Sequence, residues 1–308
     1  MPLENAKDPS KLNRKLVIGT RDSRLAIAQT QIVADYIRAK YPSIELELLP
    51  LKTTGDKLLG RLDKVGGKGL FVKELDEALR LGRVDLTVHS LKDVPSDLPP
   101  DLPLIAFSQR RAVEDVLVLP ESGVWDQSKA IGTSSQRRKL QMLKLYPNCR
   151  VEPIRGNIIT RLEKLETEGF GALILARAGL ERINLAQRIA RVFSVEEMIP
   201  AAGQGVLAVQ ARADFDASIL EGFNCPETEV LVRAERAFVQ ELAGGCSSAT
   251  CCHASLKSSK VYLNCLYSPD NQKVYSFAES CAPEKAEAKA REAARKLKKQ
   301  VRENAKKV

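Results

Sequence analysis

Short apolar, β-prone runs alternate with stretches of helical periodicity along the first two thirds of the chain. The run KLVIGT at residues 15–20 is followed by a stretch in which apolar residues such as Leu25, Ala28 and Ile32 recur every three or four positions. This spacing predicts an amphipathic helix over residues 22–40. The run ELELLPL then returns to strand character. Such alternation predicts an α/β architecture with largely parallel sheets.

The alternation continues, with strands expected in DLTVHS, VLVL, CRVEPI, GALILA and VLAVQAR and helices expected to start near Ser134 and Asn157. Farther on, a helical stretch, two alternating runs around SPDNQ and a long Ala- and Lys-rich helix predict a small α+β unit. No internal sequence repeat is visible. With 308 residues, of which 44% are hydrophobic, the chain can supply a core to two or three domains.

Composition argues against several functional classes. No apolar run approaches the roughly 20 residues of a membrane span, and the start MPLENAKDPSKLNRK lacks the apolar centre of a signal peptide. The seven cysteines are an odd number without CxxC spacing, so we expect free thiols, no metal and a reducing, cytoplasmic setting. The net charge of +9 could attract nucleic acid, but aromatic residues make up only 5% and no stacking motif accompanies the charge.

The segment GTSSQRR combines hydroxyl side chains with two arginines at an expected helix start. Thr133, Ser134 and Ser135 precede Arg137 and Arg138, which fall in the first turn. Backbone N–H groups and guanidinium groups in this arrangement suit a carboxylate or a phosphate. The alternative is an ordinary N-cap followed by arginines that face solvent.

Other arginines stand at comparable places. Arg21 follows the first strand, Arg155 precedes an expected helix and Arg161 lies within it. Each alone is typical of a surface or ion-pairing arginine. Several at helix starts in two similar domains predict that a polyanion is held in a cleft between the domains.

The segment HSLKDVP places Ser90, Lys92 and Asp93 at the end of a strand, where α/β sheets present side chains to ligands. A carboxylate beside a lysine and several arginines should have a lowered pKa, so Asp93 suits the stabilisation of a cation better than the donation of a proton. The alternative for Asp93 is a turn-capping aspartate. We interpret His89 as a buried, hydrogen-bonded histidine rather than a catalytic one.

Three glycine-rich segments complete the candidate features. Residues 53–69 are polar and predict an exposed loop that could close over a ligand. In GGC, two glycines would let a bulky group reach the thiol of Cys246, although a free cysteine is more often a small packing residue. GQG predicts a tight turn before a strand, and its glycine spacing is not that of a dinucleotide or P-loop fingerprint.

Read together, GTRDSRLA, TTGDK, GGKGLFVKEL, VDLTVHSLKDVPSDLP, GTSSQRR, IRGN, GQG and ELAGGCS resemble, in the same order, the motifs of the porphobilinogen deaminase (hydroxymethylbilane synthase) family. The resemblance runs from about residue 15 to about residue 250. It implies two periplasmic-binding-protein-like α/β domains around a cleft plus a small α+β C-terminal domain. It also implies a dipyrromethane cofactor, bound to Cys246 as a thioether primer. Four porphobilinogen units are then joined head to tail with release of ammonia, and the linear tetrapyrrole hydroxymethylbilane is released by hydrolysis.

The resemblance also assigns domains and partners. Domain 1 is expected at residues 15–108 and 206–223 with the catalytic aspartate and the loop, domain 2 at residues 112–200 with the arginines, and domain 3 at residues 229–308 with the primer cysteine. We expect a cytoplasmic monomer that takes porphobilinogen as substrate and binds neither nucleic acid, metal nor membrane.

Site residues follow from their positions in these motifs. Asp93 matches the family's catalytic aspartate, expected to hydrogen-bond pyrrole N–H groups and to stabilise the cation formed as ammonia leaves. Each pyrrole carries an acetate and a propionate, which arginines bind well. The residues expected to hold the primer are Ser90, Lys92, Asp93, Thr133, Ser134, Ser135, Arg137, Arg138, Arg155 and Gly156. Those expected to hold substrate are Arg21, Ser23, Arg161, Arg182 and Gln204.

The chain departs from the family pattern at three places. CSSATCCHASL stands where a Val-Pro pair usually follows the cysteine, Gln210 stands where an acid is common, and Gln136 replaces a leucine. Cys251 and Cys252 are expected to begin a sheet, on opposite faces, and to serve in packing. The competing interpretation is a non-catalytic anion-binding module, which would keep the arginines but would need neither Asp93 nor a loaded thiol.

Overall fold

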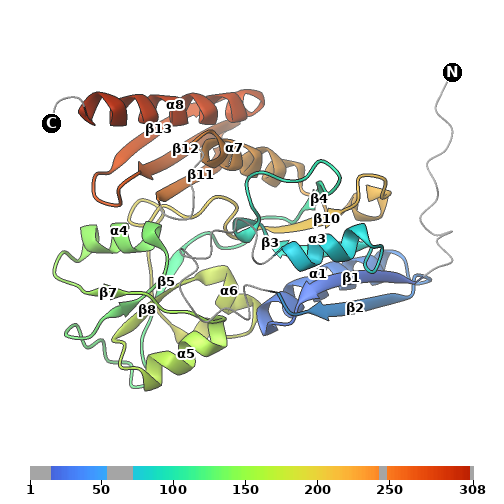
Figure 1. Ribbon diagram of the computed structural model, residues 1–308, viewed down its shortest axis with the longest axis horizontal. Helices are drawn as coiled ribbons and strands as arrows, with labels where there is room; N and C mark the ends of the chain where they lie inside the picture. Colours follow the sequence, from blue (N-terminus) through green and yellow to red (C-terminus); the bar gives the residue numbers. More distant parts are fainter. Residues whose placement is uncertain (1–14, 54–71, 243–247, 306–308) are drawn as a thin grey trace. The chain divides into compact units, whose positions relative to one another are not determined.

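The computed structural model describes residues 15–53, 72–242 and 248–305, and these fall into two compact units (Figure 1). The described residues of one unit are 15–53, 72–109 and 206–226. Those of the other are 110–205 and 227–305.

The first unit is built on a five-stranded sheet in the order β2-β1-β3-β10-β4. The first three strands are parallel, and β10 is antiparallel to both of its neighbours. Its strands are β1 (Leu16–Arg21), β2 (Leu46–Leu51), β3 (Leu86–Ser90), β4 (Leu104–Phe107) and β10 (Leu207–Ala211), and its helices are α1 (Arg24–Lys40) and α3 (Lys73–Arg80).

Two helices bury opposite faces of this sheet because neighbouring strand residues point to opposite sides. Ile18 of β1 packs with Val33 of α1. Val17, the next residue on β1, packs instead with Leu79 of α3. Gly82, with a φ of +65°, follows α3 and adopts the left-handed conformation in which glycine commonly ends a helix.

The second unit contains another five-stranded sheet, in the order β7-β6-β8-β5-β9. Again three strands are parallel and the fourth, β5, is antiparallel to both neighbours. The helices α4 and α5 cover its two faces (Figure 1). The elements are β5 (Asp115–Val118), β6 (Ile131–Gly132), α4 (Gln136–Leu145), β7 (Val151–Glu152), α5 (Ile158–Thr167), β8 (Ala172–Ala176), α6 (Arg177–Arg182) and β9 (Ile189–Val192).

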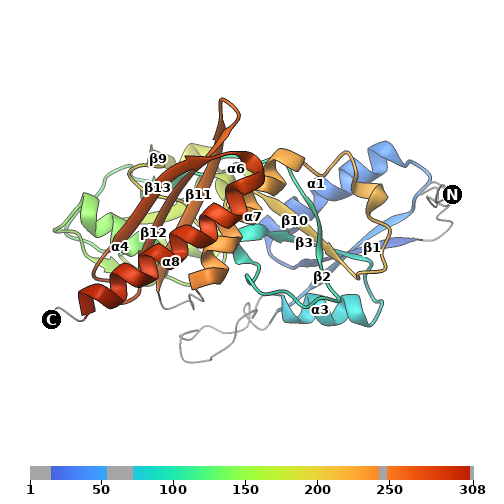
Figure 2. The same cartoon turned by 90° about the horizontal axis from the view of Figure 1, so that it is seen from above.

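A three-stranded antiparallel sheet belongs to the same unit and consists of β11 (Ala249–Lys257), β12 (Lys260–Ser268) and β13 (Tyr275–Cys281). Helices α7 (Pro226–Leu242) and α8 (Ala286–Ala305) supply Phe238 and Leu297 to the core on one face. Figure 2 shows α8 running across these strands. On the other face, Cys251 and Leu266 pack with Leu140 of α4. Short 3-10 turns occupy Leu91–Asp93, Ala186–Arg188, Ala217–Leu220 and Pro283–Lys285.

The structure confirms the expected fold class of two α/β sheets followed by a small α+β part. The helix expected at residues 22–40 begins at Arg24, with Ser23 as its N-cap. The strand expected in CRVEPI is only two residues long, and β4, β6 and β9 were not predicted. The loop expected at residues 53–69 lies outside the described residues except for Thr53. The three-domain boundaries remain a prediction.

Candidate functional site

Asp93 lies on the 3-10 turn that leaves the carboxyl end of β3. The turn is anchored because Leu91 is buried and its N–H group donates to Val206 O at 3.0 Å. The Asp93 side chain itself is exposed, and among the described residues it forms no hydrogen bond or ion pair. It therefore does not cap the turn, and its oxygens are available to accept N–H groups from a ligand.

His89 is buried on β3 beneath this turn. Its Nε2 atom lies 2.9 Å from Thr87 Oγ1 and 3.1 Å from Gln210 Oε1. Burial lowers the pKa of His89 to about 4, while the charges of Asp93 and Arg21 act in opposite directions. His89 is thus a neutral, hydrogen-bonded packing residue, as expected from the sequence, and Gln210 is its partner.

Four other expected site residues of the first unit lie near the carboxyl ends of the parallel neighbours β1 and β3. Arg21 is the half-buried last residue of β1, and its charge reaches His89. Ser23 accepts from Ala26 N at 3.3 Å and so caps α1. Ser90 Oγ accepts from Gln29 Nε2 at 2.7 Å. Both serines already have hydrogen-bond partners within the protein. Lys92 is half-buried.

In the second unit, the hydroxyl residues before α4 stabilise their own backbone. Ser135 is the N-cap, and its Oγ atom accepts from Arg138 N at 3.4 Å. Thr133 Oγ1 accepts from Ser135 N at 3.3 Å. Ser134 Oγ donates to Ile154 O at 2.7 Å. The helix start is therefore capped before any ligand arrives.

Arg137 and Arg138 bind one buried carboxylate, that of Asp115 at the start of β5. Arg137 Nη1 lies 2.6 Å from Asp115 Oδ2, and Arg138 Nη2 lies 2.7 Å from Oδ1. The arginines are 6% and 7% exposed and Asp115 is fully buried. Their charges hold the pKa of Asp115 well below its usual range, against the opposing effect of burial. This excludes the alternative in which the two arginines face solvent.

The sequence analysis did not single out Asp115. An acidic residue at the start of the apolar run DVLV could have indicated a buried, paired carboxylate. Arg137 and Arg138 carry two positive charges and Asp115 carries one negative charge, so this cluster has a net charge of +1. Gln204 Nε2 also donates to Asp115 Oδ1 at 3.1 Å and to Val113 O at 2.6 Å. The Oε1 atom of Gln204 is buried without a hydrogen-bond partner in the structure.

The expected residues around α5 form a separate group. Gly156 has a φ of +113°, and a Cβ atom there would lie 2.7 Å from the Thr160 side chain, so glycine is required. Asn157 caps α5 through Thr160 N at 3.0 Å, and Arg161 Nε donates to Gly156 O at 2.8 Å. Arg155 is half-buried, and its side chain forms no hydrogen bond or ion pair within the described ranges. Arg155 is thus a cation available to an anionic ligand.

Cys246 lies outside the described residues. The structure does describe two cysteines that follow it closely in the sequence, Cys251 and Cys252. Cys251 and Cys252 are fully buried on opposite faces of the three-stranded sheet, as expected. Burial raises the pKa of Cys251 to about 12 and raises that of Cys252 as well. Cys252 Sγ also lies 3.1 Å from Cys265 Sγ on the paired strand. These thiols are inert towards attachment of a bulky group because the thiolate is the nucleophile.

A second buried acid, Glu235 of α7, was also missed. Its carboxylate pairs with Arg110 at 2.7 Å and accepts from Gly203 N at 2.7 Å and Ala254 N at 2.8 Å. The charge of Arg110 helps to hold its pKa at about 2 in spite of burial. Glu235 therefore ties the GQG turn to β11, the strand that follows Cys246.

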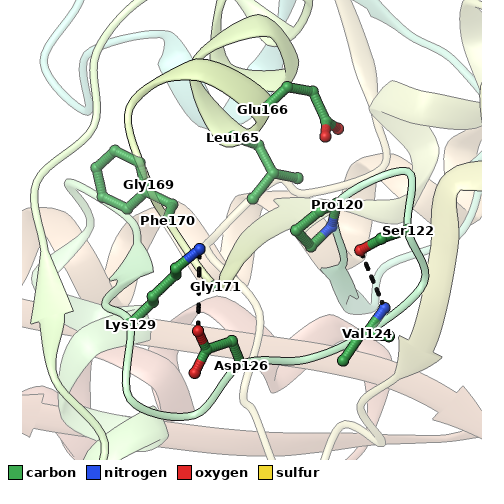
Figure 3. Close-up of a pocket in the computed structure, with 10 residues that line it drawn as sticks. All are labelled: Pro120, Ser122, Val124, Asp126, Lys129, Leu165, Glu166, Gly169, Phe170 and Gly171. Atoms are coloured by element: carbon green, nitrogen blue, oxygen red, sulfur yellow. Dashed lines mark hydrogen bonds and ion pairs between the residues drawn. The ribbon is translucent and has the colours of Figure 1, made fainter.

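A cavity of about 250 Å³ lies elsewhere in the second unit (Figure 3). Its lining includes Lys129, Glu166 and Phe170 and none of the expected site residues. Lys129 faces Asp126 across 3.9 Å. Among the described residues, no group of three or more metal-binding side chains gathers, and no helix there is long and apolar enough to cross a membrane.

Two α/β sheets, a cation available at Arg155 and an exposed carboxylate at Asp93 define an α/β protein with groups that can bind an anionic ligand. The family model described as "Porphobilinogen deaminase, dipyromethane cofactor binding domain" matches residues 16–220, and "Porphobilinogen deaminase, C-terminal domain" matches residues 230–302. The chain belongs to the porphobilinogen deaminase family.

Curated relatives agree. The chain is 51% identical over 268 residues to the porphobilinogen deaminase of Acetivibrio thermocellus. The aligned region covers 86% of this chain and 92% of the relative. The enzyme of Chromobacterium violaceum is 41% identical over 296 residues, covering 92% and 94%. Among solved structures, a TRAP periplasmic solute binding protein from Desulfovibrio salexigens has a TM-score of 0.39 at 12% identity, covering 68% and 72%.

Proposed function

We propose that this chain joins four porphobilinogen molecules head to tail on a dipyrromethane primer held by Cys246, then releases hydroxymethylbilane with water. In each addition, the aminomethyl carbon of porphobilinogen loses ammonia and forms a bond to the free α-carbon of the chain. That α-carbon then gives up its proton.

One observation carries the proposal: the free carboxylate of Asp93 on an anchored turn, in the motif where the family has its aspartate. Loss of ammonia leaves a cationic methylene-pyrrolenine derived from the substrate. An exposed carboxylate without internal partners can accept the pyrrole N–H group and stabilise that charge. Neighbouring His89 is neutral, so it adds no competing positive charge. This division of roles supports Asp93 as a stabiliser of the cation.

The described residues fit a primer with several carboxylates. Arg155 is a half-buried cation whose side chain has no hydrogen-bond or ion-pair partner among the described residues. Dipyrromethane, when bound, supplies the free pyrrole carbon at which the chain grows. Arg155 would bind one of its carboxylates, while Arg137 and Arg138 would act mainly through the positive charge that their shared Asp115 leaves in excess.

The competing function is an anion-binding module without catalysis. Incubation of the purified protein with porphobilinogen separates the two, because the enzyme consumes it, releases four ammonia molecules per product and forms a linear tetrapyrrole that closes to a porphyrinogen with loss of water. Binding of porphobilinogen without ammonia release would support the module.

We also propose that the protein acts as a monomer in the cytoplasm. The six cysteines within the described ranges are free, which is typical of a reducing compartment. Light scattering at working concentration tests the oligomeric state, and a stable dimer mass would contradict this part.

A further inference from the structure

The GQG turn at residues 203–205 packs closely against Arg111 and Ala112, which precede β5 of the second sheet. Gly203 and Gly205 have φ values of +74° and +87°, and a Cβ atom on Gly205 would lie 2.6 Å from Arg111 O. The close approach brings two arginines to one carbonyl group. Arg111 N and Arg182 Nη2 donate to Gly205 O at 3.1 and 2.8 Å.

Arg182 is a half-buried cation that follows Glu181 in sequence. Its Nε–H group is buried and has no hydrogen-bond partner in the structure. Burial, and then the charge of Arg111, lower the pKa of Arg182 to about 10, with Glu181 acting in the opposite direction. Glu181 also pairs with Arg177 at 2.7 Å, so its negative charge is shared between two arginines.

Arg111 adds a second positive charge at the same place. Its side chain is exposed and forms no hydrogen bond or ion pair with another described residue. The backbone N–H of Arg111 shares the Gly205 carbonyl with the Arg182 guanidinium, and the charge of Arg111 lowers the pKa of Arg182. An anion lying against both guanidinium groups would relieve this repulsion. A carboxylate suits this arrangement because its two oxygens can each accept from one guanidinium group.

We propose that Arg111 and Arg182 form a two-arginine subsite for one carboxylate of the incoming porphobilinogen. The sequence already indicated Arg182 as a substrate ligand, and Arg111 is the new member. Its guanidinium group is the second cation of the subsite and so contributes to the affinity for porphobilinogen. The subsite rests on the proposed function because porphobilinogen provides the carboxylate.

Steady-state kinetics of Arg111→Gln test the subsite, with Arg150→Gln as the matched control. Arg150 is also an exposed arginine of the second unit, paired with Glu152 at 3.1 Å and remote from the GQG turn in sequence. We expect Arg111→Gln to raise the KM for porphobilinogen about tenfold, as loss of one charge-assisted hydrogen bond should, with kcat nearly unchanged. Arg111→Lys should recover part of the loss. In an Arg182→Gln background, the same change should raise KM much less.

The outcomes separate the two proposals. If the wild-type protein turns over porphobilinogen but Arg111→Gln behaves like Arg150→Gln, the subsite is wrong and the function stands. If the wild-type protein shows no turnover, the proposed function fails. The subsite is then judged by phenylglyoxal labelling, in which porphobilinogen should protect Arg111. Equal labelling of Arg111 with and without porphobilinogen overturns the subsite.

Discussion

Asp93 shows most clearly how a single residue can be exposed, free of internal partners and still fixed in place. Because no described residue depends on its charge for pairing, replacing Asp93 by Asn should leave the fold intact. The amide cannot stabilise the cation in the same way, so we expect kcat to fall about 100-fold or more while KM changes little. Steady-state kinetics with porphobilinogen measure both.

Asp97→Asn is the matched control, because Asp97 is an exposed carboxylate four residues farther along the same segment. It should retain wild-type kcat. Near-normal turnover by Asp93→Asn would contradict the role assigned to its carboxylate.

His89 offers a test of the buried cluster behind that turn. Its pKa is about 4 in the folded protein and about 6.5 when unfolded, so between these pH values the unfolded chain binds the extra proton. The neutral residue therefore stabilises the fold fully above pH 6.5, and this contribution is lost as the pH falls towards 4, by at most about 1.4 kcal/mol per pH unit.

The expected result is that the difference in unfolding free energy between wild type and His89→Gln shrinks by about 2 kcal/mol from pH 7 to pH 5. Urea unfolding at the two pH values measures this. His253, the other histidine, is present in both proteins and cancels. A difference that stays constant with pH would show that His89 titrates normally.

At the scale of elements, arginine substitutions near the starts of α4 and α5 should have different effects. Replacing Arg137 should lower stability, whereas replacing Arg155 should impair primer binding. Arg137→Leu removes one of the two cations that neutralise the buried Asp115, so the free energy of unfolding should fall by about 3 kcal/mol or more. Arg155→Leu removes a cation that has no partner among the described residues, so it should change stability little while reducing primer loading or elongation. Urea unfolding and intact mass measure the two effects.

Arg150→Leu serves as the control for both, since its pairing with Glu152 is solvent-exposed. If Arg137→Leu proved as stable as wild type, or Arg155→Leu loaded and elongated normally, the contrast between the two helix starts would be wrong.

The elements that could be predicted are those whose sequence alone shows a pattern of buried apolar residues. α1 and α8 have helical periodicity, and β1, β3, β8 and β10 are apolar runs, so local pattern was enough. β6 has two residues and β4 and β9 have four each, and they are strands because neighbouring strands pair with them. Such short elements carry too little pattern to be recognised alone.

At the scale of the whole molecule, both sheets have three parallel strands and an antiparallel strand in the fourth place, and the sequence, which shows no repeat, gives no sign of this shared pattern. In the first sheet β10 pairs with β3 and β4, although more than ninety residues separate it from either. Pairing over such distances depends on the complete fold. The same limit applies to the site: motifs indicated Asp93, Arg155 and Arg182, but not Asp115, Glu235 or Arg111, whose roles arise from distant partners.

The central claim is that this chain carries a covalent primer on Cys246. Denaturing mass spectrometry of the purified protein, followed by peptide mapping, tests it most directly. We predict a mass exceeding that of the polypeptide by two pyrrole units, all of it on Cys246, and retained when the buried Cys251 and Cys252 are both changed to Ser. Cys246→Ser should purify without the added mass. An unmodified wild-type chain, or primer found on Cys251 or Cys252, would contradict the account.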